Sequence, residues 1–233
     1  MNYLIYDKVN SADYNVFISG ESTYATPEKD IEVIAIPGRN GTLSIDNKRF
    51  ANINIDYPAF IVHDFRQNFG AFKAALMSVS GYAKLADTYD LDHYRLARFY
   101  SAIEPEMDQL NRHGSFKISF DCDPRRFLKS GDKVREYTAA GNIKNPTLFE
   151  SLPIIRAYGT GSFTVNGVTV RINSASTYTD INSETQDAYK GTTNCNGNIQ
   201  LDNGEFPKLA SGTNAISMSG ITKLEMTPKW WTI

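Results

Sequence analysis

The stretch that decides the fold reads "IEVIAIPGRNGTLSIDN" and covers residues 31–47. Its two glycines, Gly38 and Gly41, enclose an arginine and an asparagine, a composition found both in phosphate-binding loops and in turns that reverse a strand. A phosphate loop needs a strand before it and a helix after it, because the anion binds the free N–H groups of the first helical turn. The residues after the loop therefore decide between the two interpretations.

Those residues follow the period of a strand. Leu43 and Ile45 alternate with polar residues, which indicates β structure rather than a helix, and the Gly-Lys-Ser/Thr ending of a phosphate loop is absent. Asn40-Gly41 is also a strong hairpin signal, because both residues tolerate positive φ. The stretch therefore predicts a β-hairpin whose loop presents Arg39 to a partner.

Composition supports a folded β protein. The 233 residues suit one large β domain or two small ones, and a hydrophobic content of 41% is too high for a disordered chain. The 13 Tyr and 13 Phe favour strands. A nucleic-acid binder usually carries a basic surplus, so the formal net charge of -2 argues against specific DNA or RNA binding.

The cysteines and the apolar runs exclude several other classes. Cys122 and Cys195 are far apart and form no CxxC pair, so neither a disulfide framework nor a Cys-rich zinc site is expected. We expect two buried thiols in a reducing cytoplasm. The N-terminal residues lack the pattern of a secretion signal, and no stretch of about 18 apolar residues predicts a membrane helix.

One α-helix is predicted near residues 64–80. Asp64 can cap it, with Gln67 as the capping-box partner, and Gly81 stands where a helix C-terminal glycine belongs. Its apolar residues recur at spacings of four and three, which places them on one face for packing against a sheet. These residues are Phe65, Phe69, Phe72, Leu76 and Val79.

The second half of the chain is predicted to be β throughout. "SFTVNGVTVRI", residues 162–172, is a hairpin pattern around Asn166-Gly167. Short strands separated by Gly, Asn and Pro turns are typical of a sandwich. The hydrophobic pattern lapses after the strand "GSFKISFDCDP", and we predict an N-terminal β domain with one α-helix over residues 1–130 and a C-terminal β-sandwich over residues 131–233.

The histidines and carboxylates offer weak signals for chemistry. Asp90, Asp92 and His93 form a possible metal set in "YDLDHY", but the glycine and distal glutamate of an EF-hand are missing; a solvated polar turn is the favoured interpretation. His63 and His113 belong to no metal motif. The sequence therefore predicts no metal site.

Asp121 and Asp123 are the only pair considered for catalysis. Residues two apart in a strand share a face, and paired carboxylates can cleave glycosidic bonds. Asp123 precedes Pro124, however, which favours a turn or capping role. No G-x-S-x-G elbow is present, and we predict neither catalytic residues nor a cofactor. Trp230 and Trp231 are candidates to stack on a glycan or anchor an interface, with one of them expected in a core.

An ordered set of turns and strands then points to a family. "PGRNGT", "GSFKISFDCDP", "FTVNGVTVRI", "YTDINSETQDAY", "NGEFPKLASGTNAI" and "MTPKWW" follow one another along the chain. In this order they resemble the distal tail protein of long-tailed, non-contractile bacteriophages, over nearly all residues. Asn182 departs from the family pattern, since members often place an acidic residue there.

The resemblance implies a structural component of a phage tail tip or baseplate. It implies a homo-hexameric ring built by the N-terminal domain and a galectin-like C-terminal sandwich outside it. The ring would join the tail tube protein to the tail-associated hub protein and support receptor-binding or other baseplate proteins for host adsorption. DNA would pass through the channel without specific binding. Such a protein is a virion component made in the bacterial host cytoplasm, with no membrane partner.

Within that ring, the hairpin loop is expected to contact a neighbouring subunit or an adjoining tail protein. The residues of this predicted interface are Pro37, Gly38, Arg39, Asn40 and Gly41. The alternative function is a carbohydrate-binding module for host cell-wall glycan during adsorption, with Trp230 and Trp231 as its aromatics. A glycan-cleaving enzyme is the least favoured hypothesis, and the chain is predicted not to be an enzyme.

Overall fold

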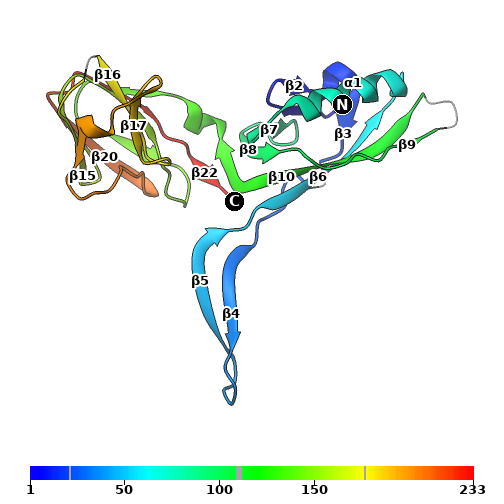
Figure 1. Cartoon of the computed structure of the whole chain (residues 1–233), viewed down its shortest axis with the longest axis horizontal. Helices are drawn as coiled ribbons and strands as arrows, with labels where there is room; N and C mark the ends of the chain where they lie inside the picture. Colours follow the sequence, from blue (N-terminus) through cyan, green and yellow to red (C-terminus); the bar gives the residue numbers. More distant parts are fainter. Residues whose placement is uncertain (21, 109–111, 176) are drawn as a thin grey trace. The chain divides into compact units, whose positions relative to one another are not determined.

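The computed structural model describes residues 1–20, 22–108, 112–175 and 177–233. The chain divides into two compact units: unit 1 comprises Met1–Arg126 together with Ile233, and unit 2 comprises Phe127–Thr232. Each unit has its own hydrophobic core. The predicted mainly β fold is confirmed, and one α-helix, α1 (Phe65–Ser78), is present among the described residues (Figure 1).

Unit 1 contains strands that precede and follow α1 in the chain. Its first strands are β1 (Leu4–Tyr6), β2 (Val9–Asn10), β3 (Val16–Ile18), β4 (Lys29–Ala35), β5 (Thr42–Phe50) and β6 (Ile53–Ile61), with a 3-10 helix at Ser11–Tyr14. After α1 come β7 (Ala83–Asp87), β8 (His93–Arg98), β9 (Glu106–Met107) and β10 (Gly114–Leu128), whose last residues belong to unit 2.

The main sheet of unit 1 has the order β2-β1-β7-β8-β10-β6-β3, and β9 pairs with β10. β10 and β6 pair antiparallel from Gly114 opposite Ile61 to Cys122 opposite Ile53. The predicted alternation in β10 is present, because Phe116, Ile118 and Phe120 are all buried. One face of the sheet therefore forms the core of unit 1.

Helix α1 covers that core with its predicted aromatic stripe. Phe65 and Phe72 are buried, and Phe69 meets Phe116 edge-on with ring centroids 5.0 Å apart. The predicted capping box is wrong: Asp64 has a left-handed backbone with φ 51° and makes no side-chain cap hydrogen bond. A left-handed residue at this position directs the chain sharply into the helix, so its carboxylate does not reach the first-turn N–H groups.

β4 and β5 form a separate two-stranded sheet. We call this hairpin, residues 29–50, the arm. Its strands pair in register from Ala35 opposite Thr42 to Ile31 opposite Asp46. The hairpin prediction holds, but its turn differs from the Asn-Gly type, because the positive φ angles fall on Gly38 (77°) and Gly41 (84°). The arm leaves unit 1 after residue 28 and returns at residue 51, where the Ala51 N–H donates to the Glu28 carbonyl at 2.9 Å.

Unit 2 contains two antiparallel sheets with the orders β11-β21-β13-β16-β17-β18 and β12-β20-β14-β15-β19. The strands of the first sheet are β11 (Arg135–Tyr137), β13 (Ile154–Tyr158), β16 (Tyr178–Asn182), β17 (Asp187–Lys190), β18 (Thr193–Asn194) and β21 (Lys223–Thr227). Those of the second are β12 (Gly141–Asn145), β14 (Gly161–Val165), β15 (Val168–Ile172), β19 (Ile199–Leu201) and β20 (Gly212–Ser219). 3-10 turns at Lys129–Asp132 and Asn196–Asn198 and the strand β22 (Trp231–Thr232) complete the unit.

Side chains from both sheets meet in one core, as expected for a sandwich. Ile155 and Leu224 come from the first sheet, and Phe163 and Val170 come from the second. The predicted Asn166-Gly167 turn joins β14 to β15, with φ angles of 49° and 84°. Both residues are left-handed, as a two-residue hairpin loop requires.

Candidate interaction surface

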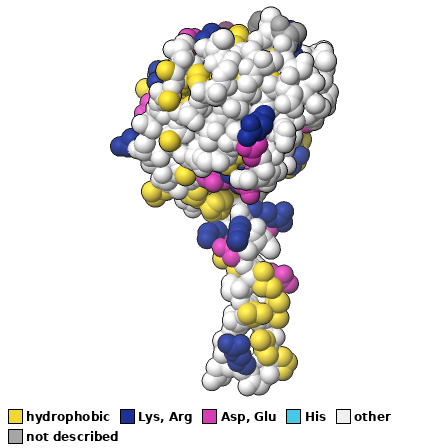
Figure 2. All heavy atoms as spheres, turned by 90° about the vertical axis from the view of Figure 1, so that its left-hand side faces the viewer, with side chains coloured by type: hydrophobic (Ala, Val, Ile, Leu, Met, Phe, Trp, Pro, Cys, Tyr) yellow, Lys and Arg dark blue, Asp and Glu magenta, His cyan; other side chains and the backbone are white. Residues whose placement is uncertain are grey.

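The arm exposes apolar side chains along both of its strands. Val33 is 61% exposed and Leu43 is 45% exposed, although each lies within a regular strand. Hydrophobic side chains line the visible surface of the hairpin in the space-filling view (Figure 2). The exposed apolar residues of the arm are Ile31, Val33, Ile34, Ile36, Leu43 and Ile45. Exposed apolar side chains gathered on one element in this way are typical of a surface that contacts another molecule.

These side chains lie on both faces of the ribbon. Residues directly opposite each other in a ladder point to the same side, so Ile34 and Leu43 share one face. Ile45 follows on that face, because it is two residues from Leu43. Ile31 and Val33 belong to the opposite face, since they alternate with Ile34 along the chain. A two-stranded ribbon cannot cover either face by itself, and both are open to partners.

Charged groups are concentrated at the base of the arm. Lys29 pairs with Asp46 at 3.4 Å, and the Arg49 guanidinium pairs with Asp30 at 2.5 Å. Hydrogen bonds from Asn47 and then Arg49 lower the pKa of Asp30 below its ordinary value. The part of the arm beyond these pairs is uncharged except for Glu32 and Arg39. An apolar centre with charges at its margin is the composition of an interface.

The predicted contact residues 37–41 lie together at the tip of the arm, and all five are exposed. The backbone N–H of Arg39 donates to the Ile36 carbonyl at 3.2 Å and closes the turn. Within the part of the chain that the structure describes, the Arg39 guanidinium makes no ion pair. The tip therefore offers an unpaired cation at the end of an apolar ribbon.

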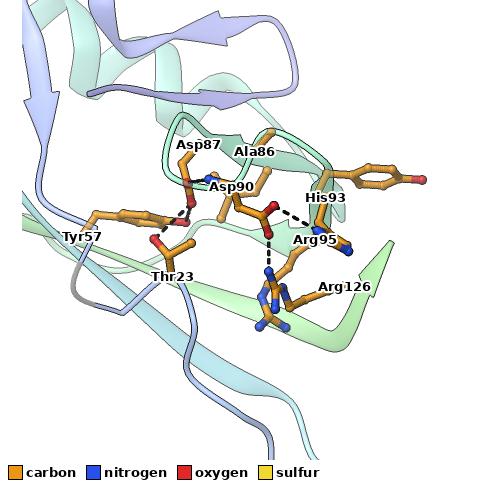
Figure 3. Close-up of a pocket in the computed structure, with 10 residues that line it drawn as sticks. Thr23, Tyr57, Ala86, Asp87, Asp90, His93, Arg95 and Arg126 are labelled. Atoms are coloured by element: carbon orange, nitrogen blue, oxygen red, sulfur yellow. Dashed lines mark hydrogen bonds and ion pairs between the residues drawn. The ribbon is translucent and has the colours of Figure 1, made fainter. Parts of the chain in front are cut away.

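Partly buried charged residues lie beside the entry to the arm, shown in Figure 3. We call Asp87, Asp90, His93, Arg95 and Arg126 the root cluster. Asp90 lies at its centre, with one carboxylate oxygen 2.9 Å from His93 Nδ1 and the other in an ion pair with Arg126. Burial opposes the ionisation of Asp90, but the hydrogen bonds of His93 and Arg126 outweigh it and lower the pKa of the carboxyl.

Two further members of the root cluster hold the polypeptide directly. Arg95 is 6% exposed, and its guanidinium donates to the carbonyls of Ala25 and Pro124, both at 3.0 Å. Asp87 accepts hydrogen bonds from the hydroxyls of Tyr57 at 2.7 Å and Thr23 at 3.3 Å. Burial lowers the pKa of the Arg95 guanidinium. Of the possible metal set Asp90, Asp92 and His93, Asp90 has an arginine partner and Asp92 is exposed.

The residues considered for chemistry lie in ion pairs or at the surface. Asp121 is buried and pairs with Arg98 at 2.6 Å, and Asp123 pairs with Arg125 at 2.8 Å. A carboxylate saturated by arginine is a poor proton donor. No group of three or more His, Cys, Asp or Glu side chains is placed to bind a metal ion among the described residues. No helix in the same residues is long and apolar enough to cross a membrane.

The two C-terminal tryptophans have different environments. Trp230 is 3% exposed and packs in the core of unit 2. Trp231 is half-buried and stacks on Phe149 with ring centroids 4.3 Å apart, while its indole N–H donates to the Glu150 carbonyl at 2.8 Å. Of the two aromatics, Trp231 alone has surface available for a glycan or a partner.

The interface predicted from the sequence covers the tip, residues 37–41, and does not include the exposed apolar side chains of the strands. The signal was present in "IEVIAI", because apolar residues occupy both the odd and the even positions after Glu32. Such a run predicts a strand covered on both faces, and in the structure this strand is exposed on both.

Comparison with known proteins relates the whole chain to phage tail structures. The chain matches no protein-family model and no curated protein by sequence. It is similar in structure to the Dit protein (gp 19.1) of phage SPP1, described as a paradigm of the hub adsorption apparatus of phages that infect Gram-positive bacteria. The TM-score is 0.78 at 12% identity, and the match covers 100% of both chains.

Two further matches are chains of the phage P2 baseplate in its activated conformation. The calcium-bound baseplate gives a TM-score of 0.55 at 11% identity over 97% of this chain and 96% of the other. The strontium-bound baseplate gives 0.57 at 10% identity over 97% of both. The chain therefore has the fold of these phage hub and baseplate proteins, along its full length.

Proposed function

We propose that the protein is a structural component of a phage tail tip, in which copies of the chain close into a homo-hexameric ring. The ring joins the tail tube protein to the tail-associated hub protein and carries receptor-binding or other baseplate proteins on its outside. The site of action is the virion. DNA crosses the central channel without specific binding, in keeping with the net charge of -2.

The observation that carries this proposal is the arm. An isolated two-stranded hairpin is marginally stable in water, yet this one keeps regular strands of seven and nine residues. A second copy that covers these apolar side chains removes them from water, which is favourable. A head-to-tail contact of this kind generates a ring when its rotation closes. The full-length fold similarity supports the same role.

Light scattering behind size exclusion, with negative-stain images of the peak, tests the proposal. Six copies of the 26.0 kDa chain give a mass of about 156 kDa and a particle with a central hole. If the chain needs its neighbours to close, the ring forms on mixing with the tail tube or hub protein. A chain that stays monomeric alone and with both partners contradicts the proposal.

A pair of matched variants assigns the contact to the arm. Leu43→Lys places a charge on the apolar ribbon and is expected to abolish the large species. Leu148→Lys is the control, because Leu148 is a leucine of unit 2 that is 90% exposed and distant from the arm in sequence. Arg39→Glu tests the tip separately: unchanged assembly of this variant removes the contact predicted for residues 37–41 but leaves the ring in place.

A second candidate function is glycan binding by unit 2, favoured by the stacked Phe149 and Trp231 rings. Aromatic faces bind sugars through their apolar ring surfaces, and both rings of this stacked pair are partly exposed. Titration with host cell-wall polysaccharide should then give binding that Trp231→Ala removes. No binding at millimolar glycan would exclude this function.

A further inference from the structure

The root cluster contacts three consecutive residues of the segment that leads into the arm. Thr23 donates to Asp87, and Ala25 accepts from Arg95. Between them, the Tyr24 ring lies 5.4 Å below the Arg126 guanidinium carbon, and its hydroxyl donates to the Tyr89 carbonyl at 2.9 Å. Three consecutive residues are thus attached to the body of unit 1, only four residues before β4 begins at Lys29.

The cluster has no capacity for a ligand. The cavity that its side chains line has a volume of about 20 Å³, which is room for a single water molecule. Its charges are also used internally, because Asp90 accepts from both His93 and Arg126, and Arg95 donates to two backbone carbonyls. Charges that are already paired within the protein are not available to bind a substrate.

We propose that the root cluster is a latch that fixes the direction in which the arm leaves unit 1, with the Asp90–Arg126 pair as its closing contact. Arg126 is the last residue of unit 1 before the chain enters unit 2. The latch therefore joins the entry of the arm to the end of the same unit. Its importance for assembly rests on the proposed ring, whereas its effect on the arm root does not.

The lever formed by the arm explains why its root must be rigid. β5 has nine residues and spans about 30 Å at ~3.3 Å per residue. A tilt of about 10° at the root then moves the tip by roughly 5 Å, more than the ~4 Å range of a side-chain contact. Copies whose arms differ by this amount cannot repeat one contact around a closed ring.

Hydrogen–deuterium exchange of the full-length protein tests the latch without reference to assembly. Arg126→Gln removes the charge that faces Asp90 and Tyr24. Tyr24→Leu removes the ring and hydroxyl from a side chain that is 60% exposed, so the fold of unit 1 is preserved. Arg125→Gln is the matched control, because Arg125 is the neighbouring arginine and its ion pair with Asp123 lies two residues away.

We expect both latch variants to raise amide exchange at residues 22–28 by about fivefold or more, while the control changes it by less than about twofold. The Ala25 amide, which donates to the Ser22 carbonyl at 3.1 Å, is the most informative position. Equal exchange in Tyr24→Leu and the unaltered protein overturns the latch, even if Arg126→Gln fails to fold.

The oligomer masses of the same variants, measured by light scattering, then separate the latch proposal from the ring proposal. If a latch variant shows faster exchange at residues 22–28 but forms the same single oligomer as the unaltered protein, the latch has no role in assembly. An unaltered protein that never assembles refutes the ring alone.

Discussion

The side-chain amide of Asn52 donates a hydrogen bond to the buried carboxylate of Asp121 at 3.0 Å. Asn52 lies between β5 and β6, at the point where the chain returns from the arm. The same carboxylate pairs with Arg98, and the Asn52 amide also reaches the Tyr82 hydroxyl at 2.7 Å. Asp121 therefore holds Asn52, directly after the arm, as the root cluster holds residues 23–25, before the arm.

Replacing Asp121 by Asn should lower the free energy of unfolding. The substitution removes the charge that faces Arg98 and weakens two hydrogen bonds to a buried group, which costs about 1–3 kcal/mol of unfolding free energy. Urea unfolding measures the loss. Asp46→Asn is the control, because its pair with Lys29 is solvent-exposed and no measurable change is expected. Unchanged stability of Asp121→Asn would contradict the structural role of this carboxylate.

The two cysteines should react at very different rates with a thiol reagent. Cys122 is fully buried, and burial raises its pKa to about 12, so its reactive thiolate is scarce at neutral pH. Cys195 is half-buried at the surface of unit 2. A chromogenic disulfide reagent should therefore modify one thiol quickly and the second only after unfolding. Cys195→Ser should abolish the fast phase, and a fast phase that persists would show that Cys122 is accessible.

The contribution of Asp90 to stability should depend on pH in one direction. Its pKa is lowered in the folded protein, so ionised Asp90 stabilises the fold above the ordinary carboxyl pKa of about 4. This contribution is lost as the pH falls through the lowered folded value. The difference in unfolding free energy between the unaltered protein and Asp90→Asn should thus be full near pH 7 and shrink as the pH falls below the ordinary carboxyl pKa of about 4.

Asp92→Asn is the control for that titration. Asp92 lies in the same turn, but its side chain is exposed. Its replacement should leave the unfolding free energy within about 0.5 kcal/mol of that of the unaltered protein, because it is a surface substitution. A difference for Asp90→Asn that stays constant with pH would mean that its packing, and not its charge, stabilises the turn.

Each unit should respond to damage in its own core. Phe72 is fully buried in unit 1, and Phe163 is buried in unit 2. Replacing either by Ala should cost about 3–5 kcal/mol, because both transfer energy and packing are lost. Calorimetry should show a lowered transition for the altered unit and an unshifted one for the other. A single transition that moves equally in both variants would show that the units unfold together.

The elements that depend on local sequence were predictable. Asn166-Gly167 forms its turn with both residues left-handed, because a two-residue loop leaves the chain no other way to reverse. The longer loop around Gly38 can reverse the chain with several backbone conformations, and Asn40 does not take the left-handed conformation expected of it. Asp64 failed as a cap for a similar reason: residue type favours a side-chain cap, but the backbone on entering α1 decides whether the side chain can reach.

The contacts that organise the arm could not be predicted from spacing. Asp90 and Arg126 are 36 residues apart, and Asn52 and Asp121 are 69 apart, so neither pair leaves a local pattern. Alternation in β5 predicted a strand correctly but could not show that Leu43 is exposed, because a buried and an unpartnered apolar face have the same sequence. The distinction depends on whether another element of the chain packs there.

The presence of apolar side chains on both faces of the arm has a kinetic consequence. A contact that covers the face with Ile34 leaves the face with Val33 in water. A pair of copies therefore still exposes an apolar face to which a further copy can bind. In the proposed ring, growth would then stop only when the last copy closes the circle. Half-built particles would be scarce at every protein concentration, and the complete particle would appear over a narrow concentration range.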